Sequence, residues 1–514
     1  MIAPYRVPAL PPTVDLDLRG SEGPEARPDV RRYPDAAPLE ARLAERLGVD
    51  ADRVLVTAGA DDALDRTMRA LLGPESAAVV PVPTFEMTLR YARLTGARIV
   101  EIPWDGSFPT AALLGQDPDA VALLTSPNNP TGQIVPETAL EALADHFRAV
   151  LLDLAYVEYA DGDPTAWALG RDNVVVVRTF SKAHGLAGLR VGWAAGPPAL
   201  IRALRAVGAP YPVSTPSLAI ATEQLARGVP PEHLARTRAT RARLAEALAP
   251  LEVPRSEANF VYVAGPRAAW LRDGLAGLGI GVRTLLGAVR IGRPDAPDLV
   301  DRVVQSIGAV LRPEAVLLDV DGVLVDVSRS YRRAITLTCA DHGVAVTPAD
   351  IDAAKAAGDA NDDWALTRRL LLARGVDVPQ PEVTAAFEAR YQGGLWRDEP
   401  LLLARDELVA LVDRLPVALV TGRPRRDLVR LLDQHDLASL LPVCVCREDG
   451  PLKPDPWPVA EALRRLGVRR AWMLGDTVDD VRAARAAGVV PLAVGAVAGA
   501  ARCLDRPAEL LELL

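Results

Sequence analysis

The sequence predicts an α/β protein in which a domain built on a parallel-rich sheet is followed by a second domain that opens on a fresh strand. Short apolar runs alternate with amphipathic helical segments, a pattern typical of parallel strands joined by helical crossovers. This alternation occurs up to about residue 312 and starts afresh after the short linker Arg312-Pro313. A length of 514 residues is also more than one ordinary domain needs. We therefore predict two domains, residues 1–312 and 313–514.

The composition is that of an ordinary globular protein, with 49% hydrophobic and 24% charged residues. The net charge of −9 (58 basic against 67 acidic residues) argues against a general binder of nucleic acid or of membrane surfaces. Residues 1–12 lack a signal-peptide pattern, and no apolar run reaches membrane-spanning length. Four cysteines do not make a disulfide framework in so long a chain. We expect a cytoplasmic protein without nucleic-acid or membrane partners.

The first domain opens with an extended arm through Pro34 and a helix over residues 38–48. Leu39, Leu43 and Leu47 share one face of this helix, and Gly48 ends it. A second helix is expected over residues 85–95. Apolar and β-branched runs then predict the strands 54–57, 77–82, 97–102, 120–125, 150–153 and 174–177.

Residues able to bind ligands follow several of these strands, at the sheet edge where such folds place their ligands. Ala58-Gly59-Ala60-Asp61 opens a helix whose free amides suit a phosphate, although many ordinary turns look the same. The segment SPNNPTGQ (126–133) follows another strand, and its composition is also that of a plain turn. Asp153 ends a third strand, with Tyr156 just beyond it.

The stretch Arg178–Gly192 carries the most informative pattern. It places Thr179, Ser181 and Lys182 on a turn, with Arg190 eight residues after the lysine. This set suits a cofactor bearing an aldehyde and a phosphate, because the amine forms a Schiff base while the hydroxyls and the guanidinium hold the phosphate. Taken alone, Lys182 is equally compatible with an ordinary surface lysine.

In this order the residues resemble the fold-type I pyridoxal-phosphate aminotransferases, over about residues 15–312. Four motifs are similar to the histidinol-phosphate aminotransferase branch: RYP (32–34), PTFEM (83–87), APYPVSTP (209–216) and EANFVYV (257–263). The resemblance implies the fold-type I transferase fold with a small domain, pyridoxal 5′-phosphate as cofactor, and a homodimer.

The resemblance also implies roles for single residues. Lys182 would hold the cofactor and then move a proton, and Asp153 would pair with the ring nitrogen. Asn129 and Tyr156 would bond the ring oxygen, and Phe85 would stack on the ring unless it is a core aromatic. The cofactor phosphate would be bound by Thr179, Ser181, Arg190 and the turn of Gly59, Ala60 and Asp61. Tyr33 of the neighbouring subunit would join them at this phosphate. Arg290 would bind the carboxylate of the amino donor in a bidentate pair.

Some features depart from that family. The segment Arg19–Gly23 (RGSEG) replaces an Asn-Glu-Asn motif, and His184 stands where an aromatic residue is usual, so that a packing role is expected for it. The loop before Arg290 is short, which leaves Arg283 as the nearest extra cation for a substrate phosphate. These departures bear on the substrate more than on the reaction.

The second domain begins after an expected helix over residues 298–311. A strand over 315–318 runs into DVDGVLVD (319–326). Two carboxylates so close together at a strand end are costly without a cation, and Mg²⁺ prefers such oxygen ligands. A calcium-like or plain solvated loop is the alternative.

Three further motifs follow in order. They are TGRP (421–424) after a strand over 417–420, Lys453-Pro454, and GDTVDD (475–480) after a strand over 471–474. Together with DVDGVLVD they resemble the haloacid dehalogenase superfamily of phosphatases across residues 314–514. The resemblance implies that Asp319 attacks phosphorus and that Asp321 acts as general acid and base. Thr421 and Lys453 would bind the phosphoryl oxygens. Asp319, the carbonyl of Asp321 and Asp476 would hold Mg²⁺, and Asp480 would either be a further ligand or contact one of the ligands.

A long insert, about residues 327–400, separates the first two of these motifs. It is mostly helical by periodicity and looks like the helical cap of subfamily I, subgroup A, which closes over substrate. Its polar segment 360–364 (ANDDW) is equally compatible with a substrate contact and with an ordinary helix cap.

The two halves together imply a bifunctional enzyme. A transaminase would exchange imidazole-acetol phosphate and glutamate for histidinol phosphate and 2-oxoglutarate, and a phosphatase would release histidinol. Three alternatives stay open: the same chemistries on another phosphorylated keto compound, a lyase resembling threonine-phosphate decarboxylase, and one half without turnover.

Overall fold

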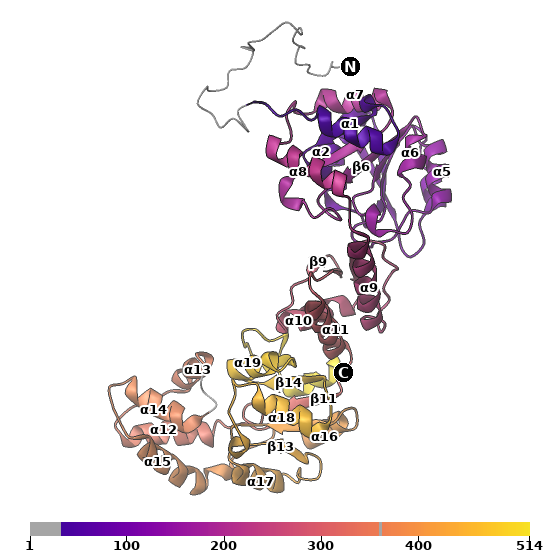
Figure 1. Cartoon of the computed structure of the whole chain (residues 1–514). Helices are drawn as coiled ribbons and strands as arrows, with labels where there is room; N and C mark the ends of the chain where they lie inside the picture. The colour runs from indigo at the N-terminus through magenta and orange to yellow at the C-terminus, as the bar shows by residue number, and fades with distance from the viewer. Residues whose placement is uncertain (1–31, 359–361) are drawn as a thin grey trace. The chain divides into compact units, whose positions relative to one another are not determined.

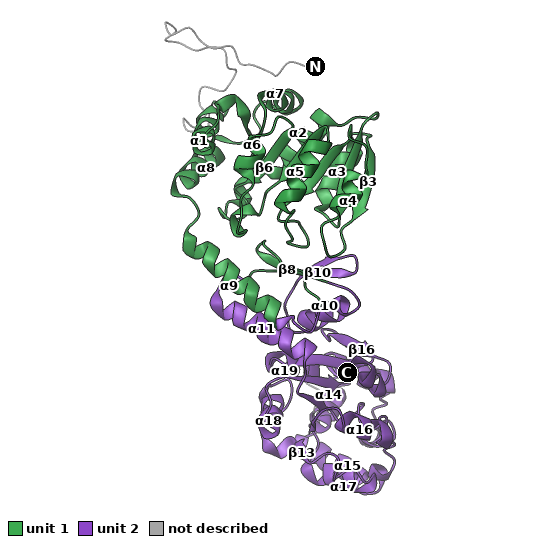
Figure 2. Cartoon of the chain, turned by 90° about the vertical axis from the view of Figure 1, so that its right-hand side faces the viewer, with its two compact units in different colours: residues 1–246, 252–263, 290–293 green, residues 247–251, 264–289, 294–514 purple. Residues whose placement is uncertain are grey.

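The computed structural model describes residues 32–358 and 362–514, shown along the chain in Figure 1. These residues form two compact units (Figure 2): one contains residues up to 246, 252–263 and 290–293, and the other contains 247–251, 264–289 and 294–514. Each unit is described by itself. The segment Arg19–Gly23, most of the amino-terminal arm, and Ala360 and Asn361 of the ANDDW segment lie outside the described residues.

Unit 1 is built on a seven-stranded sheet of order β1-β7-β6-β5-β4-β2-β3. All neighbours pair in parallel except β7, which runs antiparallel to both β6 and β1. The predicted strands are confirmed to within one or two residues. Their bounds are β1 (Val54–Thr57), β2 (Ala77–Val82), β3 (Arg98–Pro103), β4 (Val121–Thr125), β5 (Ala149–Asp153), β6 (Val174–Thr179) and β7 (Gly192–Ala195).

Helices cover both faces of this sheet, which explains why its strands are continuous apolar runs. Along β5, Val150 and Leu152 join one core cluster and Leu151 joins another on the opposite face. The helices are α1 (Ala37–Leu47), α2 (Gly59–Leu71), α3 (Glu86–Leu94), α4 (Thr110–Leu114), α5 (Glu137–His146), α6 (Thr165–Leu169), α7 (Pro198–Val207), α8 (Thr215–Arg227) and α9 (Pro231–Ala247). A separate sheet of order β8-β10-β9 contains β8 (Phe260–Ala264), β9 (Arg283–Leu285) and β10 (Ala288–Gly292).

Unit 2 contains a six-stranded, fully parallel sheet of order β13-β12-β11-β14-β15-β16. The predicted strands 315–318 and 417–420 are confirmed, and 471–474 extends by one residue. Three of the predicted motifs follow β11, β12 and β14, the central strands. The bounds are β11 (Ala315–Leu318), β12 (Val417–Val420), β13 (Val443–Val445), β14 (Ala471–Gly475), β15 (Val490–Val494) and β16 (Arg502–Leu504).

The insert between β11 and β12 is helical, as the periodicity predicts. It contains α12 (Tyr331–Asp341), α13 (Pro348–Ala356), α14 (Asp363–Leu372) and α15 (Gln380–Gln392). The helices around the sheet are α16 (Arg405–Val412), α17 (Arg425–Gln434), α18 (Trp457–Leu466), α19 (Val478–Ala486) and α20 (Leu510–Leu513).

Two more helices, α10 (Arg267–Gly277) and α11 (Pro297–Leu311), also belong to unit 2 (Figure 2). Trp270 of α10 meets Trp472 of β14 edge to face, with ring centroids 5.0 Å apart. The Trp472 indole N–H donates to the carbonyl of Ala309 at 2.9 Å, and that of Trp270 donates to Val310 at 3.1 Å. The domain boundary at residues 312/313 stays a prediction from sequence. Among the described helices, we find none that is long and apolar enough to cross a membrane.

Candidate active sites

The first site lies in unit 1, where β4, β5 and β6 end. It is a pocket lined by most of the residues that the sequence predicts for a cofactor: Ala60, Asp61, Phe85, Asn129, Asp153, Tyr156, Thr179, Ser181, Lys182 and Arg190, with Ala155 in addition. These residues span 131 positions of sequence (60 to 190) and meet because parallel strands bring their carboxyl ends to one edge.

One end of this pocket collects groups suited to an anion. Arg190 donates to the Ser181 hydroxyl at 3.3 Å and pairs with Asp61 at 3.0 Å, at the amino terminus of α2. Its φ of +53° is uncommon for a residue with a side chain. Gly59 has φ +79°, and a Cβ there would lie 2.7 Å from Arg190 Nη2. The turn thus needs glycine to bring backbone amides and guanidinium together, an arrangement that fits a phosphate.

The other end of the pocket contains a buried carboxyl group. Asp153 is 4% exposed, and burial raises its pKa to about 6, although a hydrogen bond from the Ala155 amide at 3.0 Å opposes this. Such a group gains from a cationic partner, and a protonated pyridine nitrogen is one. The Lys182 amine lies 5.1 Å from the centroid of the Tyr156 ring. The residues present therefore fit the implied cofactor.

Besides Gly59, two predicted residues of this site lie outside the pocket lining. Arg290 donates to the Asn129 side-chain oxygen at 2.5 Å and lies over the Phe260 ring, 4.7 Å from its centroid. It is therefore in contact with a pocket residue and could reach a ligand there. Tyr33 is 60% exposed and stacks on Tyr211 at 4.6 Å. Its predicted place in a neighbouring subunit stays a prediction.

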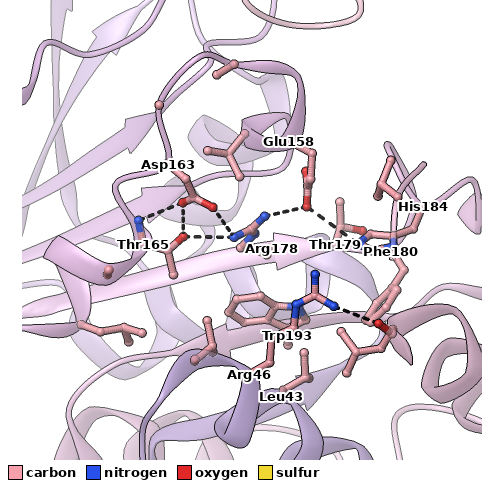
Figure 3. Close-up of a pocket in the computed structure, with 18 of the residues that line it drawn as sticks. Leu43, Arg46, Glu158, Asp163, Thr165, Arg178, Thr179, Phe180, His184 and Trp193 are labelled. Carbon is pink, nitrogen blue, oxygen red and sulfur yellow. Dashed lines mark hydrogen bonds and ion pairs between the residues drawn. The ribbon is translucent and has the colours of Figure 1, made fainter. Parts of the chain in front are cut away.

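A larger cavity of about 590 Å³ shares Thr179 with the cofactor pocket (Figure 3). Arg178 spans it between Glu158 at 2.7 Å and Asp163 at 2.9 Å, as Figure 3 shows. His184 packs at 4.9 Å on Phe180, in keeping with the packing role expected for it, and burial lowers its pKa. The sequence does not indicate this cavity, because its lining comes from elements that share no motif.

The second site lies in unit 2. Lys453 Nζ contacts Asp319 at 3.0 Å and Asp480 at 2.5 Å, and it also donates to the carbonyl of Val420 at 3.0 Å. Thr421 follows that carbonyl at the end of β12 and is 4% exposed. Three motifs distant in sequence thereby meet around one buried amine. Burial raises the pKa of Lys453's partner Asp319 well above its usual range, because the amine only partly offsets desolvation and the neighbouring carboxylates.

The carboxylates of this cluster are suited to a cation. Carboxylate oxygens of Asp319, Asp476 and Asp480 lie within 4.8 Å of one another, and they form the one group of possible metal ligands among the described residues. Burial raises the pKa of Asp476 to about 6, although Lys355 and Lys453 oppose this. Hard oxygen donors at this spacing fit Mg²⁺. The Asp321 carboxylate is not in the group, consistent with a carbonyl contribution only.

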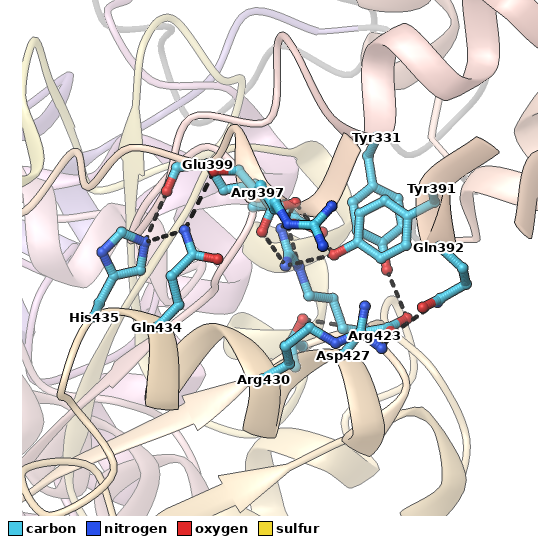
Figure 4. A network of polar contacts seen from close by, with 12 residues as sticks. Tyr331, Tyr391, Gln392, Arg397, Glu399, Arg423, Asp427, Arg430, Gln434 and His435 are labelled. Atoms are coloured by element: carbon cyan, nitrogen blue, oxygen red, sulfur yellow. Dashed lines mark hydrogen bonds and ion pairs between the residues drawn. The ribbon is translucent and has the colours of Figure 1, made fainter. Parts of the chain in front are cut away.

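Asp321 instead contacts Arg423, a residue to which the sequence gives no role. The guanidinium reaches Asp321 Oδ1 at 2.5 Å and Glu399 Oε2 at 2.8 Å. It also lies 4.7 Å from the centroid of the Tyr331 ring, and Tyr391 donates to Glu399 at 3.3 Å. Figure 4 shows Tyr331, Tyr391 and Glu399 gathered around the arginine. The general acid-base candidate Asp321 is thus held by Arg423, whose other neighbours Tyr331 and Glu399 come from the two ends of the helical insert.

A signal for Arg423 exists in the sequence, since it is part of the TGRP motif, two residues after Thr421. No local pattern marks Glu399, which is an acidic residue in a linker. Asp362, in the ANDDW segment, caps α14 by accepting from the amides of Trp364 and Ala365, and its other oxygen pairs with Arg447 at 2.5 Å. The helix-cap alternative is therefore correct for Asp362.

Comparisons with known proteins show the family of each half of the chain. The family model described as aminotransferase class I and II matches residues 21–312, more than half of the chain, and the model described as haloacid dehalogenase-like hydrolase matches residues 313–488. A histidinol-phosphate aminotransferase of Xanthomonas campestris pv. campestris is 37% identical over 332 residues, covering 58% of this chain and 91% of the relative. The chloroplastic enzyme of that name from Nicotiana tabacum is 33% identical over 308 residues, covering 55% and 73%.

A protein of Phytophthora nicotianae named imidazoleglycerol-phosphate dehydratase is 48% identical over 194 residues; this covers 35% of the chain but only 43% of that relative. Among solved structures, histidinol-phosphate aminotransferase from Sinorhizobium meliloti, in complex with pyridoxal 5′-phosphate, matches with a TM-score of 0.50 and 26% identity, covering 55% of this chain and 84% of that one. The chain is therefore an enzyme that belongs to the class I and II aminotransferase family and continues into a haloacid dehalogenase-like hydrolase domain.

Proposed function

We propose that the chain is a bifunctional enzyme that transaminates imidazole-acetol phosphate with glutamate and then hydrolyses the histidinol phosphate it forms. The observation that carries this proposal is the joining, in one chain, of two pockets whose chemistries follow each other: an amine-forming site and a phosphate-ester-cleaving site. The relatives support the substrate, because they are named for histidinol phosphate and imidazoleglycerol phosphate, both imidazole-bearing phosphate esters.

In the transaminase site, pyridoxal 5′-phosphate would supply an electron-withdrawing ring that stabilises negative charge at the substrate carbon. Asp153 would pair with the ring nitrogen, and its burial would strengthen that pairing. Arg190, Ser181, Thr179 and the start of α2 would hold the phosphate. Lys182 would attach the cofactor and move the proton at the reacting carbon, and Asn129 and Tyr156 would orient the ring.

Arg290 accounts for the carboxylate of the amino donor. Its guanidinium already lies against Asn129 at 2.5 Å, and a carboxylate would offer it a charged, bidentate partner in place of a neutral amide. Phe85 borders the pocket and also packs at the edge of the core, so both expectations for it are compatible. We also propose that the enzyme acts as a homodimer, with Tyr33 completing the partner's phosphate site.

In the hydrolase site, Asp319 attacks phosphorus and Asp321 gives a proton to the leaving alcohol, then takes one from water. Lys453 and Thr421 stabilise the charge of the transferring phosphoryl group. Asp319, Asp476, Asp480 and the carbonyl of Asp321 would hold Mg²⁺, which would neutralise phosphoryl charge. Arg423 holds Asp321 in place for both proton transfers, because it fixes that carboxylate at 2.5 Å.

The proposal is tested on the purified full chain with pyridoxal phosphate and Mg²⁺. Histidinol phosphate should yield inorganic phosphate and, with 2-oxoglutarate, glutamate. Lys182→Ala should abolish glutamate formation and leave phosphate release within about 2-fold, while Asp319→Asn should do the reverse. If neither product forms although a generic phosphate ester is hydrolysed and the cofactor accepts other amines, the substrate assignment is wrong and the two chemistries stand.

One lyase reaction shares the lysine and the cofactor pocket, namely decarboxylation of an amino-acid phosphate. Arg290 is compatible with either reaction, because both have a carboxylate to bind. Incubation with threonine phosphate separates them: CO₂ release without any need for 2-oxoglutarate would replace the transaminase proposal by the lyase.

A further inference from the structure

A small cavity lies at the hydrolase site, beside the predicted general acid-base Asp321. It is lined by Asp321, Tyr331, Asp363, Trp364, Gly422, Arg423, Pro424 and Arg447. The presence of Asp321 in the lining places it where the alcohol part of a phosphate ester leaves. Asp363 and Trp364 come from the helical insert, at the start of α14. The cavity therefore joins insert and sheet at the leaving group.

Both arginines in the lining are already neutralised. Arg423 is paired with Asp321 and Glu399, and Arg447 is paired with Asp362 at 2.5 Å. Arg447 also lies over the Trp364 ring, 4.4 Å from its centroid. These cations consequently offer little to an anionic leaving group.

Two atoms of the lining residues have no hydrogen-bond partner among the described residues. Asp363 Oδ1 and Trp364 Nε1 are buried, and neither has a hydrogen bond within the part of the chain that the structure describes. The nearest cation to Asp363 is Lys355, at 4.0 Å, too far for a hydrogen bond. An acceptor with negative charge and an aromatic donor thus border the space for the leaving group. Buried polar atoms are normally satisfied, so this pair indicates a ligand.

Lys355 completes the pattern with a second charge. Its side chain is 11% exposed. Burial lowers the pKa of Lys355, but the carboxylates of Asp363, Asp476 and Asp321 raise that pKa by more, so the amine stays charged. The insert therefore presents a cation toward the carboxylates where the phosphoryl group reacts, and an anion in the leaving-group cavity. A substrate with a phosphate at one end and an ammonium at the other matches both.

We propose that Asp363 and Trp364 form a specificity site that selects phosphate esters whose alcohol carries a protonated amine. The ammonium donates to Asp363 Oδ1, and the indole N–H of Trp364 donates to a further acceptor atom of the same alcohol. This inference rests on the proposed hydrolase function and narrows it to amino-alcohol phosphates. Asp363 and Trp364 are specificity residues here and take no part in the proton transfers.

The test compares two esters of nearly equal shape, O-phosphoethanolamine and propyl phosphate, in which a methyl group replaces the ammonium, on the full chain with Mg²⁺. The wild-type enzyme should prefer the amine by about 10- to 100-fold in kcat/KM, the value of one charge-assisted hydrogen bond. Asp363→Asn should reduce that preference to below about 3-fold, mainly by slowing the amine ester. Asp352→Asn is the matched control, because Asp352 lies on α13 of the same insert with its side chain 60% exposed. It should leave the preference unchanged.

A wild-type preference below 2-fold overturns the inference, whether or not the variant folds. So does a clear preference that survives in Asp363→Asn, and so does an equal loss on both esters. Histidinol phosphate, assayed beside them, separates this inference from the proposed function. If amine esters are preferred through Asp363 but histidinol phosphate is not cleaved, the inference stands and that substrate falls. If histidinol phosphate is cleaved without dependence on Asp363, the reverse holds.

Discussion

Replacement of Arg423 by methionine should damage stability and catalysis through two different partners. The side chains of Arg423 and Glu399 are each 1% exposed. Without the guanidinium, Glu399 keeps the Tyr391 hydroxyl at 3.3 Å but is left as a buried, unpaired charge. Removing one partner of a buried pair costs about 3–5 kcal/mol. With a urea m-value of about 2 kcal/mol/M, the unfolding midpoint of unit 2 should fall by about 1.5–2.5 M.

The double variant Arg423→Met/Glu399→Leu distinguishes the two effects. Because both charges are gone, its stability should return to within about 1 kcal/mol of the wild type. Phosphate release should stay at least 10-fold low, because Asp321 is still without the group that holds it. Arg425→Met is the control, since Arg425 is 46% exposed in its pair with Asp449 and should change stability by less than about 1 kcal/mol.

Pulse proteolysis across a urea series measures the folded fraction of each unit separately, and phosphate release reports on the site. Equal destabilisation of the single and double variants would refute the reasoning, because the buried Glu399 charge would then not be the cause. Full recovery of phosphate release in the double variant would show that Asp321 needs no support from Arg423.

Three further outcomes follow from the geometry. Burial raises the pKa of Asp153 from 3.8 to about 6, so between those pH values the folded, cofactor-free protein binds one proton more than the unfolded chain. The free energy of unfolding should therefore fall by up to about 3 kcal/mol as the pH rises from 4 to 7. Urea titrations of Asp153→Asn should lack this part of the pH dependence. Mg²⁺ should raise the urea midpoint of unit 2 in the wild type but not in Asp476→Asn, and a midpoint that responds equally in both would exclude the carboxylate cluster as the metal site. Gly192→Ala would place a Cβ 2.5 Å from the Gly59 carbonyl carbon and 2.7 Å from the Ala60 nitrogen. A fluorescence titration should then show that pyridoxal phosphate binds at least about 10-fold more weakly. The control Gly73→Ala has no heavy atom within 4 Å of its new Cβ and should bind the cofactor normally.

The sequence predicts the strands well because most of them are buried on both faces. Such strands are unbroken apolar runs, so the first and last residues of Val174–Val177 or Ala315–Leu318 can be read from the sequence. Ligand-binding residues at the ends of parallel strands are predictable for a related reason, since the topology brings those ends together. Thr179, Asp153 and Asp319 all follow this rule.

The residues that the sequence does not reveal meet through tertiary packing alone. Arg423 and Glu399 are 24 positions apart and belong to different elements, so no periodicity links them. The antiparallel strand β7 is short and contains Gly and Ala, which weakens its apolar signal. Asp363 is ambiguous for another reason: an acidic residue at a helix start is explained by capping until its burial is known.

The contact between Trp270 and Trp472 in unit 2 decides where the chain can be divided into two fragments. Helices α10 and α11 lie within the stretch matched by the aminotransferase family, yet both contact strand β14 of the hydrolase sheet: Trp270 through the ring of Trp472, and Ala309 through its carbonyl, which accepts from the Trp472 indole N–H. If the gene were cut between codons 312 and 313, the hydrolase fragment would lose the Ala309 carbonyl that accepts from the Trp472 indole N–H. The aminotransferase fragment would expose the apolar face that packs on the Trp472 strand.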